Sequence, residues 1–261
     1  MKYFKKKKPL ISIIVATFNS EKTISDTLDS IKIQIFNNYE IIIIDKDSSD
    51  KTIEIVKKKK LKTRIYIGKD HGIFDAINKG IKKSRGKIIS ILHSNDYYYD
   101  KYSLENVANL FTLKKVDIVY GNLIYVSQKN KNFIIRYWKS SDFKKNLFIK
   151  GWSPPHPAFF CKKKNYIEAG LYKINFGNSA DIELMHRFLQ VRKFKSYFLN
   201  KALVVMRYGG ASNNNIKNII KQNLVTLNFL KIKKNFLLVA LFIIYKICNR
   251  TLQATLYKIT K

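Results

Sequence analysis

Apolar and polar positions alternate along the first hundred residues in blocks whose spacing changes. Leu10–Ala16 is a nearly unbroken apolar run that ends at a polar cluster, Thr17–Ser20. Apolar side chains then recur at helical spacing, at Ile24, Leu28, Ile31 and Ile35. An apolar run is typical of a strand covered on both faces, and the wider spacing is typical of an amphipathic helix. The segment therefore predicts a buried strand followed by a helix.

Two further strand-to-helix units and a fourth strand follow. The strands are expected at Glu40–Ile44, Arg64–Ile67 and Ile88–Leu92, and the helices at about Lys51–Lys60 and at Ile73–Lys83. Strands that alternate with helices favour right-handed crossovers and parallel pairing. The sequence thus predicts an α/β fold with a mostly parallel, twisted sheet and helices on both faces.

A polar cluster follows each of these strands. The four clusters are Thr17–Ser20, Asp45–Asp50, Asp70–Gly72 and Ser94–Asp96. The carboxyl ends of parallel strands meet at one edge of a sheet, and ligands bind there in open α/β folds. We therefore expect the clusters to form one ligand site, which favours an enzyme.

The cluster after the fourth strand carries the clearest chemistry, because Asn95 and Asp96 follow the apolar run closely. Magnesium and manganese ions typically take one or two carboxylates and complete their shells with phosphate oxygens and water. Asp96 alone can therefore serve a Mg²⁺ or Mn²⁺ site beside a diphosphate. The alternative is that Asn95 and Asp96 only open a turn before the next helix.

The order and spacing of the clusters resemble family 2 glycosyltransferases, most closely the bacterial branch that builds exopolysaccharide and lipopolysaccharide. The likeness covers roughly residues 9–190 and rests on Val15–Asn19, Ile44–Thr52, Asp70–Gly80 and Ser94–Asp96. The third segment, DHGIFDAINKG, is the most distinctive. The resemblance implies a GT-A fold, a nucleotide-sugar donor, a divalent metal (Mg²⁺ or Mn²⁺) and inversion at the anomeric carbon.

The resemblance also implies roles for single residues. The residues expected to contact the nucleotide-sugar are Thr17, Asn19, Asp47, Asp70, Asn78 and Asn95. Asp96 would contact the metal or the diphosphate. Asn19 has a structural alternative as a helix cap, and Asn78 as a helix-end residue before Gly80. Lys46 stands where the family often has an acid that binds the base, so the identity of the base stays open.

Asp181 is the candidate general base for the acceptor hydroxyl. In the family an acidic residue opens a helix at this point, and a well-placed carboxylate typically contributes about 10² to 10⁴ in rate. Glu183 is the second candidate for this role. Two positions along a helix correspond to about 200° of rotation, so only one of the two is expected at the site. The alternative for Asp181 is a first-turn acid that interacts with the helix dipole.

The segment Gly151–Phe160 contains three of the four prolines of the chain and is predicted to be an ordered, non-helical loop. The resemblance implies that Trp152 and His156, within this loop, border the acceptor. The alternative is that both residues only build a structural corner.

The amino-acid composition bears on two alternative functions and on the cellular compartment. The 261 residues include 50 Lys and Arg against 18 Asp and Glu, a net charge of +32. This charge would suit nucleic-acid binding, but the lysines are dispersed and no nucleic-acid-binding motif is present. A nucleotidyltransferase on a similar fold is a further alternative, although the glycine-rich loop it needs is missing. The two cysteines, Cys161 and Cys248, lack metal-site spacing and favour the reducing cytoplasm.

Length and charge predict two parts, a GT-A domain over residues 1–215 and a basic C-terminal part over 216–261. The nucleotide-sugar half of the domain would extend to about residue 100 and the acceptor half from about 101 to 215. No Asp or Glu follows Glu183. The C-terminal part has an amphipathic face made of Ile216, Ile219, Ile220, Leu224, Leu227 and Leu230.

Ten apolar residues, Phe236–Tyr245, follow that face, and ten residues are too few to span a bilayer, which needs about 20. We therefore expect a pair of interfacial helices that holds the protein on the anionic inner face of the cell membrane, as a peripheral protein. That location would suit a lipid-linked acceptor. The alternative is that the helices pack on the catalytic domain or on a second subunit.

Overall fold

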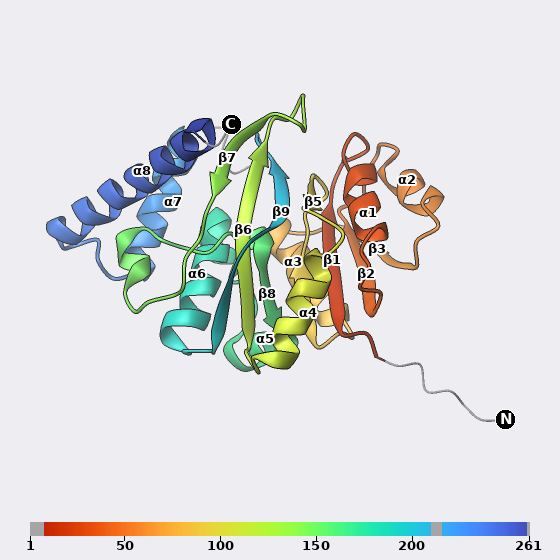
Figure 1. The fold of residues 1–261 in the computed structure, drawn as a ribbon, viewed down its shortest axis with the longest axis horizontal. Coiled ribbons are helices and arrows are strands. Elements are labelled where there is room, and N and C mark those ends of the chain that lie inside the picture. Colours follow the sequence, from red (N-terminus) through yellow and green to blue (C-terminus); the bar gives the residue numbers. More distant parts are fainter. Residues whose placement is uncertain (1–7, 210–215, 260–261) are drawn as a thin grey trace.

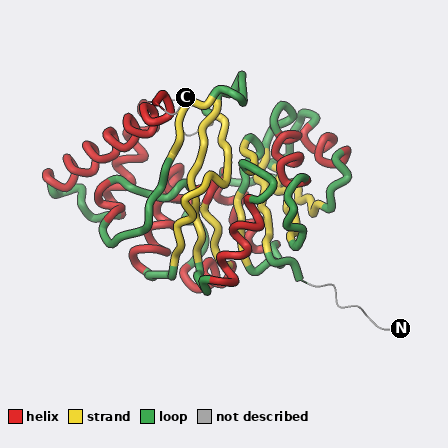
Figure 2. The backbone as a smooth tube through the Cα atoms, viewed as in Figure 1, coloured by secondary structure: helices red, strands yellow, loops and turns green. Residues whose placement is uncertain are grey.

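The computed structural model describes residues 8–209 and 216–259. One nine-stranded sheet crosses the protein, and helices cover both of its faces (Figures 1 and 2). This arrangement confirms the predicted α/β class. The expected boundary after residue 215 lies outside the described residues, and the division into two parts stays a prediction.

The strands are β1 (Ile11–Thr17), β2 (Tyr39–Asp45), β3 (Thr63–Ile67), β4 (Ile88–Ile91), β5 (Asp96–Tyr98), β6 (Ile118–Val126), β7 (Ile134–Trp138), β8 (Phe159–Lys162) and β9 (Ser196–Arg207). The α-helices are α1 (Ile24–Lys32), α2 (Thr52–Lys58), α3 (Ile73–Lys83), α4 (Ser103–Leu113), α5 (Lys163–Ala169), α6 (Ala180–His186), α7 (Ile216–Phe229) and α8 (Phe236–Ile259). The strand order is β3-β2-β1-β4-β8-β6-β9-β5, and β7 pairs with β6.

The first four strands pair in parallel, as predicted. β1 lies between β2 and β4, and β3 extends the sheet beside β2. Thr17 at the end of β1 is opposite Asp45, which ends β2. The polar clusters that follow these strands therefore begin at one edge of the sheet. Helix α3 begins and ends at the predicted residues, Ile73 and Lys83.

The second half of the sheet is mixed. β8 is antiparallel to β4 and β6, β7 is antiparallel to β6, and β5 is antiparallel to β9. Only β6 and β9 pair in parallel in this half. The prediction of a mostly parallel sheet therefore holds for β1 to β4, whereas the sheet as a whole is mixed. The pairing of β5 with β9 fixes Asp96 opposite Met206.

Two apolar cores, one on each face, hold the sheet between its helices. Ile13 and Val15 point into the core that includes the buried side chains of α1 and α4, and Ile14 and Ala16 point into the core on the α3 and α6 side. Burying such side chains typically contributes about 1.5–3 kcal/mol each. Gly80 lets α3 approach β1 closely, since a Cβ atom there would lie 2.4 Å from Cγ2 of Ile14.

The C-terminal helices α7 and α8 lie at the end of the molecule beyond β7, coloured blue in Figure 1. The expectation that the apolar segment stops at Tyr245 and is too short to span a bilayer is wrong. Helix α8 is 24 residues long and continues past Tyr245 to Ile259. Its stretch Phe236–Gln253 has a mean hydropathy of 1.4. By length and composition alone, that stretch could cross a membrane. Its inner side packs against β7 and the 3-10 turn η1 (Leu147–Lys150).

Gly151, which directly follows η1, is the closest point of approach to α8. Its φ is +68°, and a Cβ atom there would lie 2.9 Å from the carbonyl oxygen of Phe242 and 3.1 Å from Cβ of Lys246. Asn146, at the other end of η1, has nearly the same backbone angles, φ 69° and ψ 10°. Asn146 is therefore a matched control for backbone strain.

We expect Gly151→Ala to lower the free energy of unfolding by more than Asn146→Ala does. An alanine in the left-handed region is strained by roughly 1–2 kcal/mol at either position, but Asn146 already carries a Cβ atom, so only Gly151→Ala adds that atom and displaces α8. Denaturant unfolding measures both losses, and limited proteolysis reports whether α8 is released. Equal losses with α8 protected in both variants would contradict the close packing described here.

Candidate functional site

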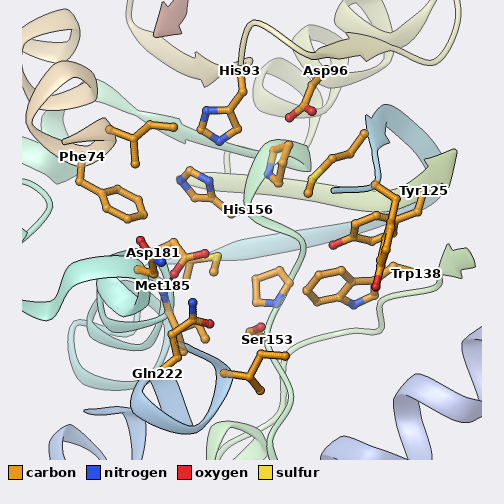
Figure 3. A pocket seen from close by; sticks show the side chains of 18 of the residues that line it. Phe74, His93, Asp96, Tyr125, Trp138, Ser153, His156, Asp181, Met185 and Gln222 are labelled. Carbon is orange, nitrogen blue, oxygen red and sulfur yellow. Dashed lines mark hydrogen bonds between the residues drawn. The ribbon is translucent and has the colours of Figure 1, made fainter. Parts of the chain in front are cut away.

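A cavity of about 1040 Å³ lies where the carboxyl ends of β1, β2 and β4 face the later part of the chain. All four polar clusters reach its lining, through Thr17, Lys46, Asp70 and Asn95 among others. The opposite walls come from the proline-rich loop, α6, β7 and α8. Figure 3 shows His93 and Asp96 on one side of the cavity and Asp181 on another. The predicted meeting of the clusters is thus observed.

Asp96 is buried at the start of β5 with its backbone fixed and its side chain unsatisfied. The hydroxyl of Thr27 donates to the Asp96 carbonyl oxygen at 2.8 Å. Neither carboxylate oxygen has a hydrogen-bond partner among the described residues. Burial raises the pKa of Asp96 well above its usual value, and the positive charge of Arg207 acts in the opposite direction. A buried carboxylate without partners is costly unless a ligand pairs with it.

The surroundings of Asp96 fit a divalent cation that takes most of its ligands from a substrate. Its two free oxygens are the atoms that Mg²⁺ or Mn²⁺ prefers. No group of three His, Cys, Asp or Glu side chains suited to a metal occurs in residues 8–209 and 216–259. These residues therefore form no closed metal cage, and phosphate oxygens and water would have to complete the shell.

Thr17 and two histidines add polar atoms to the same region. The Thr17 hydroxyl and Nδ1 of His93 are buried and lack partners among the described residues. Nε2 of His156 lies 2.8 Å from the Tyr172 hydroxyl, and the two histidine rings are 5.8 Å apart. Burial lowers the pKa of His93 to about 4, and burial together with His93 lowers that of His156 to about 3. Both rings are therefore neutral at pH 7.

Asp181 lies in the first turn of α6 and lines the cavity. Burial raises the pKa of its carboxyl group to about 6. Two effects act in the opposite direction: the backbone N–H of Ile182 donates to Oδ1 at 2.7 Å, and Lys246 contributes a positive charge. A carboxyl group with this pKa is ionised at neutral pH and is a stronger base than an exposed aspartate. Figure 3 shows Asp181 beside Met185, which is one helical turn further along α6.

Glu183 lies outside the cavity lining and forms ion pairs instead. Its carboxylate accepts hydrogen bonds at 2.9 Å from Nε and from Nη2 of Arg187, and Nζ of Lys173 lies 3.2 Å away. The Arg187 guanidinium also donates to backbone carbonyl groups at Gly170 and Leu171. Glu183 thus ties α6 to the preceding loop, and of the two acids Asp181 alone faces the cavity.

Three other predicted residues, Asn19, Asp47 and Asn78, do not line the cavity, and two of them hold loops together. Asn19 Oδ1 accepts a hydrogen bond from the backbone N–H of Ser49 at 3.0 Å, with φ of +44° at Asn19. Asp47 also has a positive φ, +59°. Asn78 exchanges two hydrogen bonds with the backbone of Tyr172, at 2.8 and 3.0 Å. The Asn19 contact joins the first two polar clusters, and the Asn78 contacts join α3 to a later loop.

Lys46 occupies the position that differs from the family pattern. It lines the cavity, its Nζ lies 3.6 Å from Oδ1 of Asp70, and it lies over the ring of Phe18. Asp70 also accepts the backbone N–H of Gly72 at 2.8 Å, so its carboxylate is held in place at the start of α3.

Comparison with known proteins identifies the family. Residues 12–163 match the sequence model of glycosyl transferase family 2. The chain belongs to this family. It is a glycosyltransferase with a GT-A fold, as the sequence analysis predicted.

Curated relatives of this glycosyltransferase carry the same kind of name. A PGL/p-HBAD biosynthesis glycosyltransferase of Mycobacterium bovis is 28% identical over 213 residues, which is 78% of this chain and 80% of that protein. An uncharacterized glycosyltransferase of Rickettsia typhi is 29% identical over 222 residues, 79% of this chain and 66% of that protein.

Solved structures support the fold of the glycosyltransferase. Residues 1–349 of S. aureus TarS superpose with a TM-score of 0.64 at 19% identity, over 90% of this chain and 70% of that one. The same TarS segment has been solved with UDP-GlcNAc. The mannosyltransferase PcManGT of Pyrobaculum calidifontis has been solved with GDP-Man and Mn²⁺. It superposes with a TM-score of 0.60 at 17% identity, over 87% of this chain and 64% of that one.

The far wall of the transferase's cavity is largely aromatic. Trp152 and His156, the predicted acceptor residues, both line it. The Trp152 ring packs on Tyr120, Phe143 and Phe148, and its buried Nε1 has no partner among the described residues. Trp152 thus has the packing role that was the structural alternative, and it also lines the cavity.

Sequence reasoning missed several residues that line the transferase's cavity. They are His93, Phe74, Tyr125, Arg136, Trp138, Tyr208, Lys246, Asn249, Arg250 and Gln253. His93 directly precedes Ser94, so the polar cluster itself could have included it. The residues of α8 recur at intervals of three and four, a polar stripe that becomes visible only if the helix continues beyond Tyr245.

Proposed function

We propose that this glycosyltransferase moves a sugar from a nucleotide-sugar to a hydroxyl group of a glycan or lipid-linked acceptor, with inversion at the anomeric carbon. The proposal is carried by one observation: a single cavity has two carboxyl groups on different walls, the buried Asp96 and the half-buried Asp181. One carboxylate suits the donor diphosphate and its cation. The other suits the proton of the acceptor, so the sugar would lie between them.

The reaction is proposed as a single displacement. Asp181 takes the proton from the acceptor hydroxyl while the oxygen of that hydroxyl attacks the anomeric carbon. The bond from that carbon to the diphosphate oxygen breaks on the opposite face, and its electron pair leaves with the nucleoside diphosphate. Thr17, Asp70 and Asn95, from the polar clusters that follow β1, β3 and β4, would bind and orient the nucleotide-sugar.

Asp96 is the residue that would hold Mg²⁺ or Mn²⁺. Such an ion would supply a positive charge that stabilises the leaving diphosphate. The two unpartnered oxygens of Asp96 support this assignment, as does the Mn²⁺ bound in the structure of a protein with the same fold, PcManGT. The donor base stays open, because Lys46 occupies the position that is often acidic.

We further propose that the protein binds the inner face of the cell membrane through the outer side of α8. Phe236, Leu237, Ile244 and Ile247 are exposed there, and Lys233 and Lys234 precede the helix. Apolar insertion and attraction to anionic lipid, about 1 kcal/mol per basic residue, would act together. The inner side of α8 lines the cavity, which favours a helix that lies along the membrane surface over one that crosses it.

Thermal stabilisation tests the donor. UDP-, GDP- and dTDP-sugars are each added with and without Mn²⁺, and a short oligonucleotide serves as the control. A donor at 100 times its dissociation constant is expected to add about 2.7 kcal/mol to the stability. A shift with one nucleotide-sugar that needs Mn²⁺ supports the proposal and identifies the base. A shift with the oligonucleotide alone would contradict it and make the net charge the functional feature.

A further inference from the structure

Helix α8 presents a polar stripe to the cavity. Lys246, Asn249, Arg250 and Gln253 all line it, and their spacing of three and four residues puts them on one side of the helix. Phe242 lies one turn earlier on the same side and is buried. This stripe lies outside the part of the chain that matches the family model, residues 12–163.

Contacts with three other segments hold the stripe in place. Nζ of Lys246 donates to Oδ1 of Asn223 on α7 at 2.6 Å. Nε of Arg136, on β7, donates to Oε1 of Gln253 at 2.7 Å. The Arg136 guanidinium also lies over the rings of Tyr125 and Trp138, at 5.3 and 4.9 Å. With the close approach at Gly151, these contacts make α8 a fixed wall of the cavity.

The charge of this wall is strongly positive. Arg136, Lys246 and Arg250 all reach the lining there, and Asp181 is the acid nearest to Lys246. Helices α7 and α8 cannot supply a counter-ion, because no Asp or Glu follows Glu183 in the sequence. Asp96, on the donor side, has Arg207 as its charged neighbour and not the residues of α8. Lys246 therefore lies on the side of the proposed base, and Arg250 is its neighbour on the same stripe.

We infer that the stripe containing Lys246 and Arg250 binds a phosphate or diphosphate group carried by the acceptor. Ammonium and guanidinium groups are the usual protein partners of phosphate oxygens, and Asn249 and Gln253 add amide groups beside them. This inference rests on the proposed function, because it assigns the acceptor of the same cavity. It narrows the acceptor from any hydroxyl compound to one with an anionic phosphate ester near the reacting hydroxyl.

The neighbourhood of Lys246 supports the inference. Burial lowers the pKa of Lys246 to about 8, and Arg250 lowers it further while Asp181 raises it. A partly buried ammonium group next to another cation is stabilised when an anion binds between them. The aromatic rings of Trp138 and Tyr208 in the same lining offer an apolar surface for the group that carries the phosphate.

Tryptophan fluorescence gives a direct test, since the only two tryptophans of the chain, Trp138 and Trp152, both line the cavity. The full-length protein is titrated with farnesyl diphosphate, inorganic pyrophosphate and farnesol. Every titration contains EDTA, so that a metal-dependent donor site does not contribute. The variants are Arg250→Gln, whose side chain is exposed, and Lys246→Met, which removes the ammonium group that lies over Phe242 but keeps an unbranched side chain. Lys57→Gln, an exposed lysine on α2 outside the cavity lining, is the control.

Each of the two α8 variants is expected to weaken the binding of farnesyl diphosphate by about tenfold or more, and Lys57→Gln by less than about twofold. Tighter binding of farnesyl diphosphate than of pyrophosphate assigns a lipid-linked phosphate, and equal binding assigns a soluble phosphate ester. Either result supports the site. Unchanged binding in Arg250→Gln and Lys246→Met, or equal binding of farnesol, overturns it.

A separate titration keeps this inference distinguishable from the proposed function. Nucleotide-sugar binding is measured with Mn²⁺ in the same variants. If no nucleotide-sugar binds to the unchanged protein while farnesyl diphosphate does, the donor assignment fails and the anion site on α8 remains. If donor binding is intact and the α8 variants bind farnesyl diphosphate normally, only the inference fails.

Discussion

Asp181→Asn is expected to lower the rate of sugar transfer by about 10² to 10⁴ and to leave donor binding unchanged. The amide has nearly the shape of the carboxyl group but cannot take a proton from the acceptor. The rate is measured at saturating donor, and donor affinity is measured from tryptophan fluorescence. Glu105→Gln, an equivalent neutralisation in α4 outside the cavity lining, should change neither quantity. Retained transfer in Asp181→Asn would move the role of base to another group.

The pH dependence of the transfer rate should reflect the ionisation of Asp181. Only the ionised carboxylate can accept the proton, and the pKa of Asp181 is raised to about 6 by burial. We therefore expect kcat/KM to rise about tenfold per pH unit below pH 6 and to level off above it. The residual activity of Asp181→Asn should lack this acid limb. A limb that persists in the variant would assign the titration to a different group.

Burial of Asp181 also has a consequence for stability. Its pKa in the unfolded chain is near the ordinary value of 3.8, so the folded protein holds the proton more tightly. The resulting stabilisation is fully present below pH 3.8 and is lost as the pH rises through about 6. At pH 8 the melting temperature of Asp181→Asn should therefore be higher than that of the unchanged protein. At pH 4 the difference in melting temperature between the two proteins should be smaller.

Asp96→Asn is expected to abolish metal-dependent binding of the nucleotide-sugar. The variant removes the negative charge to which Mg²⁺ or Mn²⁺ would bind, and an amide is a far weaker ligand for these ions. The stabilisation of about 2.7 kcal/mol expected from donor with Mn²⁺ should therefore disappear. Differential scanning fluorimetry of both proteins, with Mn²⁺ and with EDTA, measures the loss.

The ligand-free form of Asp96→Asn should melt at a higher temperature than the unchanged protein at pH 8. Burial raises the pKa of Asp96 well above its usual value, so its ionisation destabilises the fold as the pH rises. Glu105→Gln, which lies away from the cavity, should show neither effect. Donor binding that still needs metal in Asp96→Asn would exclude Asp96 as the metal ligand.

The first four strands and α3 could be predicted from sequence because their signals are local. Apolar runs that are buried on both faces, with polar clusters at their ends, define β1 to β4 and the edge where the ligand binds. Gly80 and Asn78 were singled out by pattern, and the structure gives both a packing reason: Gly80 lets α3 approach Ile14, and Asn78 binds the backbone of Tyr172.

The acceptor side could not be predicted in the same way, because it is assembled from residues distant in sequence. Arg136 and Gln253 meet across 117 residues, and β5 pairs with β9 more than 100 residues later. Asp181 and Glu183 could be separated only by their surroundings, since Arg187 pairs with one and the cavity opens to the other. The polar residues of α8 could not be predicted, because Lys246 interrupts the apolar run in the sequence.

If both proposals for helix α8 hold, the helix would couple two binding events that would otherwise be independent. Its outer side exposes Phe236 and Ile244, while its inner side contributes Lys246 and Arg250 to the cavity. If the outer side rests on a bilayer as proposed, any lipid contact that favours the docked helix also favours the complete acceptor pocket. By thermodynamic reciprocity, a bound acceptor must then strengthen the binding of the enzyme to the membrane by the same free energy. The enzyme would have its highest membrane affinity while it holds an acceptor.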